Sequence, residues 1–199
     1  MIKMLETTFD EIIESIRTNQ GLTKKTSERL LVDLLINKDK LDQFIDQLNK
    51  AKQLISTCKI CGYLSENNKC LVCSLDNRNQ NTICIVSTIL DAKNIENTNK
   101  YKGVYHILNG EINLNKNITF DKLNISSIFK RINDNTEIIL ALNSTFEGEL
   151  TANYLYKLLS TKNIKITRLA KGIPMGASLD YMDEFTLQSA FLNRKKYGE

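Results

Sequence analysis

Four cysteines with a regular spacing constrain this chain more than any other feature of its sequence. Cys58, Cys61, Cys70 and Cys73 follow the pattern C-x2-C-x8-C-x2-C, and two such C-x-x-C turns can place four thiolates at the corners of a tetrahedron. The residues between the two turns are polar and begin with a glycine, which is typical of a loop around a metal. Because protein ligands would fill all four positions, the pattern predicts one structural zinc ion per chain and no open position for substrate.

The same cysteines could instead form two disulfides or a redox-active C-x-x-C pair. The first nine residues lack the apolar stretch of a secretory signal, which favours a reducing, cytoplasmic location and hence the zinc interpretation. A fifth cysteine, Cys84, lies in an apolar run and is expected to be a buried thiol. No apolar run approaches the roughly 18 residues that a membrane span requires, so no membrane segment is expected.

Size and charge leave several functions open. The 199 residues, 42% hydrophobic and 25% charged, are enough for one or two compact domains. The net charge of +4 permits contact with nucleic acid but is too small to demonstrate it. The single histidine, His106, lies among apolar residues of a predicted strand, and we expect it to be a structural residue and not a catalyst.

Hydrophobic periodicity changes character along the chain. Apolar spacing predicts three helices before the cysteines, the third of which is expected to run from about 39 to 55 with Asp39 as its N-cap. The other expected elements are helices near 4–17 and through the leucines of 30–35, a polar connector at 76–81, strands at 83–86, 104–108, 138–142 and 164–169, helical segments near 121–132, 147–160 and 183–195, and a loop-rich stretch at 94–117. This alternation of strands and helices predicts an α/β fold with a largely parallel sheet.

The turn between the first two helices is a candidate DNA contact. Residues 21–30 (GLTKKTSERL) resemble a helix-hairpin-helix, a motif whose free amides at the start of the second helix bind the DNA backbone without reading sequence. Lys25 and Arg29 stand four residues apart and could meet the same backbone. Thr23 and Lys24 replace the second glycine and the proline of the motif, and a helical turn with solvated lysines remains the alternative.

A second motif follows the predicted strand 138–142. Residues 143–152 (NSTFEGELTA) resemble the D-x-D-x-E-G-E element of Toprim domains, the fold shared by topoisomerases and bacterial primases. In Toprim enzymes the two aspartates of this element and a glutamate after the first strand hold Mg²⁺. This chain has Asn143 and Thr145 in place of the aspartates and Ser87 in place of the glutamate. The resemblance therefore implies a Toprim scaffold that has lost its catalysis.

Two acids of the element remain, Glu147 and Glu149. They are a remnant of the Toprim site, but acidic residues at the start of a helix also stabilise the helix dipole. The sequence leaves open whether they bind any metal.

The order of hairpin, cysteine turns and acid-depleted Toprim element resembles the RecR family of bacterial recombination mediators from end to end. Further segments follow the family pattern at 83–86, 101–108, 123–125, 137–152, 168–176 and 179–187. The family usually carries glutamate where Ser87 stands and proline where Ser144 stands, so this is a divergent member. The implied domains are a helical helix-hairpin-helix region at 1–56, a four-cysteine zinc finger at 57–76, a Toprim (Rossmann-like) domain at 80–175 and a C-terminal oligomerisation element at 176–199.

The resemblance also implies a function. RecR-like proteins are non-enzymatic mediators of DNA repair that act with RecO, and in many bacteria RecF, at gaps and junctions to load RecA. They assemble into ring-shaped homo-oligomers, commonly tetramers, in which Lys25 and Arg29 would face the DNA in the lumen. The alternatives are a zinc-dependent protein scaffold that does not bind DNA and a Toprim nuclease or topoisomerase-like enzyme.

Overall fold

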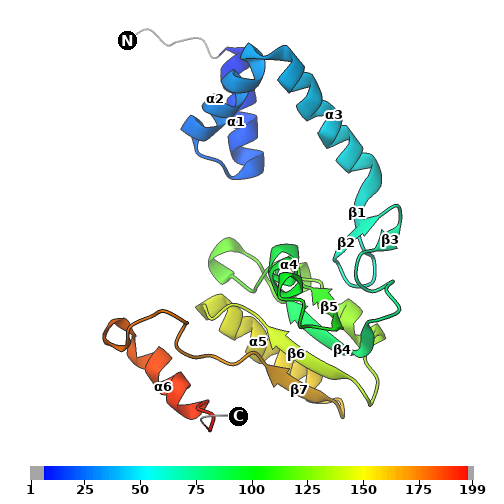
Figure 1. Ribbon diagram of the computed structural model, residues 1–199, viewed down its shortest axis with the longest axis vertical. Helices are drawn as coiled ribbons and strands as arrows, with labels where there is room; N and C mark the ends of the chain where they lie inside the picture. The colour runs from blue at the N-terminus through cyan, green and yellow to red at the C-terminus, as the bar shows by residue number, and fades with distance from the viewer. Residues whose placement is uncertain (1–6, 197–199) are drawn as a thin grey trace. The chain divides into compact units, whose positions relative to one another are not determined.

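The computed structural model describes residues 7–196, and the chain divides into two compact units, Met1–Ile55 and Ser56–Glu199. Figure 1 shows the elements of each unit along the chain. The residues 4–6 of the first predicted helix lie outside the described part. Within residues 7–196, no helix is both long enough and apolar enough to cross a membrane.

The first unit contains three helices, α1 (Thr8–Gln20), α2 (Lys24–Ile36) and α3 (Lys38–Leu54). Gly21 ends α1 in the left-handed conformation, with φ of 63°, which glycine adopts without the steric cost of a Cβ atom. Two residues later the Thr23 side chain caps α2 by accepting a hydrogen bond from the Thr26 amide. A short, well-capped turn therefore joins α1 and α2, as the hairpin resemblance predicts.

The predicted N-cap of the third helix is wrong. Asn37 caps α3, because its side-chain oxygen accepts a hydrogen bond from the Lys40 amide at 3.1 Å. Asp39 lies inside the first turn of α3 instead, where its charge is favourable to the helix dipole.

The second unit is built on a four-stranded sheet. Its strands are β4 (Asn79–Val86), β5 (Gly103–Ile107), β6 (Glu137–Ala141) and β7 (Lys165–Arg168), and their order across the sheet is β5-β4-β6-β7. All three pairings are parallel, which confirms the predicted α/β class. Helices α4 (Ile89–Asn97) and α5 (Phe146–Leu159) connect β4 to β5 and β6 to β7. These crossovers run in opposite directions from the centre of the sheet, so right-handed connections place the helices on opposite faces.

Several predicted boundaries in this unit need correction. The segment 121–132 forms two short 3-10 helices, η2 (Phe120–Lys122) and η3 (Ser126–Lys130), in place of a continuous helix. The side chain of Asn124 bonds the Ile107 carbonyl and the Ser127 hydroxyl, so it competes with regular helical bonding there. A further 3-10 helix, η1 (Leu114–Lys116), lies in the stretch expected to be loop-rich.

Other differences concern one helix that was not predicted and the ends of several elements. Helix α4 was not predicted, and its last residues fall in the stretch expected to be loop-rich; Thr88 and Asp91 form a capping box at its start. Strand β4 begins at Asn79, inside the predicted connector. The last helix, α6 (Glu184–Leu192), is capped by Asp183 and ends before the predicted residue 195. It follows the 3-10 helix η4 (Leu179–Tyr181).

The cysteine segment forms a small sheet of β1 (Ile55–Thr57), β2 (Leu64–Glu66) and β3 (Lys69–Cys70). Strands β2 and β3 form a hairpin whose two turn residues, Asn67 and Asn68, both have positive φ, as a type I′ turn requires. The segment packs on the edge strand β5, where the Ile107 amide donates to the Cys61 carbonyl at 2.8 Å. The second unit thus contains both the cysteine segment and the parallel sheet.

Candidate metal centre and carboxylate centre

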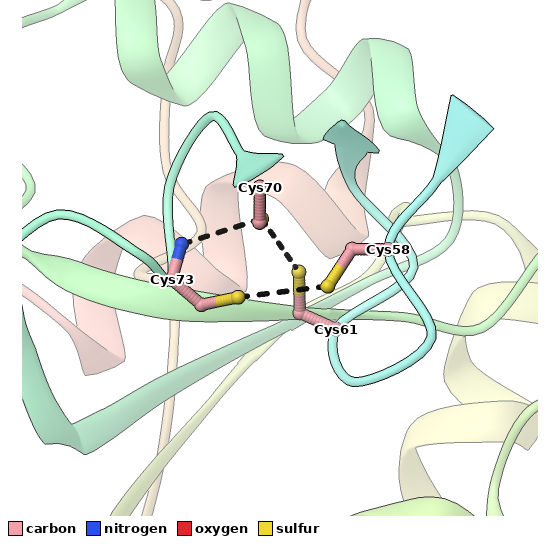
Figure 2. A group of neighbouring side chains, drawn as sticks. All are labelled: Cys58, Cys61, Cys70 and Cys73. Carbon is pink, nitrogen blue, oxygen red and sulfur yellow. Dashed lines mark hydrogen bonds between the residues drawn. The ribbon is translucent and has the colours of Figure 1, made fainter. Parts of the chain in front are cut away.

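The four cysteine sulfurs converge on one point. All four Sγ atoms lie within 4.8 Å of one another (Figure 2), with 3.5 Å between Cys61 and Cys70 and 3.6 Å between Cys58 and Cys73. A zinc ion with Zn–S bonds of about 2.3 Å separates its sulfurs by about 3.8 Å, whereas a disulfide bond is about 2.05 Å long. The cysteines are all free, so the geometry fits a shared metal ion and does not fit disulfides.

Backbone amides surround three of the sulfurs of this centre. The amides of Ile60 and Tyr63 donate to Cys58 and Cys61 at 3.4 Å, and those of Val72 and Cys73 donate to Cys70 at 3.5 and 3.3 Å. Such N–H···S bonds favour the thiolate, which is the form that binds metal. The C-x-x-C turns therefore supply both the ligands and the donors that orient them.

The electrostatics of the cluster show what full ionisation of the four thiols would need. At Cys58 burial opposes ionisation, but the amides of Cys61 and Ile60 outweigh it and lower the pKa to about 7. At Cys73 burial and the neighbouring Cys70 and Cys58 raise the pKa to about 12. Burial also raises the pKa of Cys61 far above its ordinary value. Four thiolates so close together repel one another, so they can all ionise only around a bound cation, and the all-sulfur donor set suits zinc.

A second cluster forms at the carboxyl ends of the parallel strands, the edge at which α/β sheets place their sites. Ser87 directly follows β4 and Asn143 lies just beyond β6. Both bond one carboxylate, that of Glu111, which comes from the loop after β5. Its Oε1 atom accepts from the Ser87 hydroxyl at 2.6 Å, the Asn143 amide at 3.0 Å and the Asn143 side-chain nitrogen at 3.1 Å. The Thr145 hydroxyl lies 3.5 Å from Oε2.

This second cluster does not fit Mg²⁺. The ion requires oxygen lone pairs in a near-octahedral arrangement, but the Asn143 backbone amide can only donate and already points at the Glu111 carboxylate. Among residues 7–196, moreover, only the four cysteines form a group of three or more potential metal ligands. The three positions at which Toprim enzymes carry acids hold hydrogen-bond donors here.

The two remaining acids of the predicted element point to different partners. Glu149 binds Arg168 through both of its oxygens, at 2.7 and 2.5 Å, and also pairs with Lys171. Burial would raise the pKa of Glu149, but the bonds from Lys171 and Arg168 outweigh it and hold the pKa below its usual value. Glu147 accepts from the Asn113 side chain at 3.1 Å. The structure thus does not bring Glu147 and Glu149 together as a metal site.

The sequence analysis did not predict Glu111, Arg168 or Lys171 as residues of the site. A usable signal existed for Glu111, because it follows the predicted strand 104–108 and the carboxyl ends of parallel strands meet at one edge. No comparable signal marked the cations, since pairing with Glu149 depends on how β7 is placed beside β6.

Lys25 and Arg29 lie on α2, one turn apart, and both side chains are exposed. Within residues 7–196, no ion pair involves either of them, whereas the adjacent Lys24 pairs weakly with Glu28 at 4.0 Å. The first turn of α2 contains no acidic residue. The geometry leaves this end of α2 positive, which is what contact with a phosphate backbone needs.

Comparison with known proteins covers nearly the whole chain. The family models of the Toprim domain and of the C-terminal region of RecR match residues 81–170 and 172–195. Curated proteins named "Recombination protein RecR" are 41% identical over 196 residues in Phytoplasma mali (96% of this chain, 95% of the relative) and 38% identical over 191 residues in Bifidobacterium animalis subsp. lactis (94% and 96%). Another from Bifidobacterium adolescentis is 38% identical over 190 residues (94% and 95%). This chain belongs to the RecR family.

Membership of the RecR family confirms the resemblance drawn from the motifs and the α/β fold with a Toprim domain. It supports a role in DNA recombination and repair, and it is consistent with a protein that is not an enzyme. The cysteine cluster confirms a candidate metal-binding site at the four predicted residues.

Proposed function

We propose that this RecR-family chain is a non-enzymatic mediator that binds gapped or junction DNA. It acts there with a RecO-like protein, and with a RecF-like protein where one exists, to promote RecA loading in RecBC-independent repair. The single observation that carries the proposal is the converted Toprim centre. Its three expected acid positions, Ser87, Asn143 and Thr145, all donate to Glu111, which leaves, among residues 7–196, no carboxylate cluster for metal-assisted phosphoryl transfer.

The proposed DNA contact is the exposed start of α2. Lys25 and Arg29 can neutralise phosphates without reading bases, and copies of this helix around a ring would multiply a weak contact. Such avidity explains how a chain with a net charge of only +4 could bind DNA. Binding should therefore be indifferent to sequence and should weaken steeply with salt.

Exposed apolar side chains support a homo-oligomer, for which we propose a tetrameric ring. In the first unit Ile36 is 80% exposed and Leu48 55% exposed, and in the C-terminal element Phe185 and Leu192 are at least three-quarters exposed, as is Met175 just before it. Several large apolar side chains exposed on one protein are typical of surfaces that a partner covers. We assign the C-terminal residues 176–199 to assembly.

The metal is proposed to be one structural zinc per chain, held by Cys58, Cys61, Cys70 and Cys73. Its role would be to fix the cysteine segment, the part of the chain that joins the predicted helical domain (1–56) to the Toprim domain (80–175). A mediator of this kind acts on DNA in the cytoplasm, where we place the protein.

The DNA contact is tested by fluorescence anisotropy on gapped duplex DNA across a salt series, with and without a RecO partner. We compare wild type with Lys25→Ala/Arg29→Ala and with Lys50→Ala/Lys52→Ala, a control that removes the same charge from exposed positions of α3. The first variant should bind more weakly, and each lost phosphate contact should lower the slope of log K against log salt by about 0.9. The control should change little.

Three results would contradict the proposal. Equal loss in both variants would mean that only total charge matters and not the start of α2. No binding by wild type, even with the partner present, would favour a scaffold that binds only proteins. Mg²⁺-dependent cleavage of the gapped DNA, abolished by Glu147→Gln/Glu149→Gln, would instead establish a Toprim nuclease.

A further inference from the structure

The Glu111 carboxylate stands where a Toprim centre would hold its own acids. Those acids follow the first strand and open the helix after the third strand, and here the corresponding residues are Ser87, Asn143 and Thr145. Ser87 is 3% exposed and its hydroxyl is only 2.6 Å from Glu111 Oε1. A carboxylate is therefore present at the centre, but it comes from the loop after β5 in place of the position after β4.

The start of α5 lies in close contact with the Glu111 carboxylate. Gly148 lies in the first turn of α5, and a Cβ atom there would come within 3.0 Å of Glu111 Oε1 and 2.1 Å of the Asn143 carbonyl oxygen. Only glycine permits so close an approach. Because Gly148 in the first turn of α5 comes so near Glu111 Oε1, the positive end of the α5 dipole also lies beside this carboxylate.

The donors around Glu111 come from several strand ends. In a metal-loaded centre a cation would join carboxylates from several strand ends. Here the charge is inverted, since one carboxylate joins hydrogen-bond donors from the ends of β4 and β6 and from the residues before α5. Bonds from neutral donors to a charged acceptor are among the stronger hydrogen bonds.

We propose that Glu111 is a transposed Toprim glutamate: it replaces the acid missing at Ser87, ties the carboxyl ends of β4, β5 and β6 to the start of α5, and makes the scaffold independent of Mg²⁺. Moving the acid from position 111 to position 87 should then restore part of the interaction. Placing a second acid beside Glu111 should create a pair of like charges that a divalent cation relieves. The proposal concerns the scaffold alone and does not rest on DNA binding.

The test is a double-mutant cycle on the zinc-saturated full chain. The proteins are wild type, Glu111→Ala, Ser87→Glu and the double variant Ser87→Glu/Glu111→Ala, and the readout is the midpoint of thermal unfolding by calorimetry with and without millimolar Mg²⁺. Glu147→Ala serves as the matched control, because it removes an acid from the same end of α5 without contacting the Ser87–Asn143–Thr145 donors. Glu111→Gln, which keeps the acceptor oxygen without the charge, provides a milder variant if Glu111→Ala fails to fold.

The expected pattern is specific. Wild type should unfold at the same temperature with and without Mg²⁺, and Glu111→Ala should unfold about 5 °C lower or more. Glu147→Ala should shift by about 2 °C at most, and Glu111→Gln should fall in between. Ser87→Glu should be destabilised without Mg²⁺ and recover when it is added, while the double variant should regain part of the loss caused by Glu111→Ala.

Other patterns would overturn the proposal. They are a Glu111→Ala shift no larger than that of Glu147→Ala, additive losses in the double variant, or Mg²⁺ stabilisation of wild type that disappears with Glu111→Ala. The last result would mean that Glu111 is a metal ligand and not a substitute for one.

Discussion

Acid should destabilise the Toprim unit through His106, the only histidine of the chain. His106 is fully buried on β5. Its Nε2 lies 2.6 Å from the Asn124 carbonyl oxygen and its Nδ1 3.3 Å from an Arg131 nitrogen. A carbonyl only accepts and a guanidinium only donates, so Nε2 carries the proton and Nδ1 is the acceptor. The folded site thus specifies the neutral ring.

Burial, with the positive charge of Arg131 as a smaller cause, lowers the pKa of His106 from 6.5 to about 4, against the opposing bond to Asn124. Because the pKa is lower in the folded state, the unfolded chain binds the proton first. The stability from the neutral ring is therefore complete above pH 6.5 and is lost as the pH falls toward 4. At 1.36 kcal/mol per pKa unit, the loss is about 3 kcal/mol.

Urea unfolding between pH 7 and 4 measures this loss. Near-UV circular dichroism can follow unfolding, because Tyr105, the residue before His106 on β5, stacks with Tyr63. Their ring centroids lie 5.9 Å apart. The reference is His106→Gln, which does not titrate; acid effects on the cysteine centre occur in both proteins and cancel in the difference. Wild type should lose about 3 kcal/mol more than the variant over this range. Equal pH dependence in the two proteins would refute the assignment of a buried neutral ring.

Two further predictions concern the cysteine segment. Cys61→Ala should lose one equivalent of zinc by metal analysis and give aggregated or monomeric protein on size-exclusion chromatography, because the remaining cysteines cannot hold the segment; a metal-free variant with wild-type assembly would sink this idea. Gly62→Ala should lower the free energy of unfolding by at least about 1 kcal/mol, since φ is +78° and a Cβ would lie 2.8 Å from that of Ile107. Gly172→Ala, where a Cβ meets nothing within 4 Å, is the control, and an equal effect of the two changes would contradict the packing account.

Sequence alone predicted the cysteine cluster and the parallel sheet, both of which depend on local patterns. The metal centre was predictable because two C-x-x-C turns bring their own ligands together, and the structure places all four sulfurs within 4.8 Å. The parallel sheet was predictable because β5 and the second half of β4 are short, largely apolar runs, and both are buried. In both cases the information lies within a few neighbouring residues.

The carboxylate centre was beyond such reasoning because its contacts are distant in sequence. Ser87, Glu111 and Asn143 are 24 and 32 residues apart, and only the β5-β4-β6 strand order brings them to one edge. The sequence motifs showed that the acids at positions 87, 143 and 145 are missing, but they did not point to Glu111. The pairing of Glu149 with Arg168 was missed for the same reason, since it depends on how the fold brings the start of α5 to the end of β7.

We propose above that the chain mediates RecA loading without enzymatic activity of its own. The direct measurement is the lag before RecA filaments form on gapped DNA coated with single-strand-binding protein, with a RecO partner present. Wild type should shorten the lag, Lys50→Ala/Lys52→Ala should do so equally, and Lys25→Ala/Arg29→Ala should not, with the DNA left uncut in every case. A lag that wild type leaves unchanged, or DNA cut during the reaction, would contradict the account.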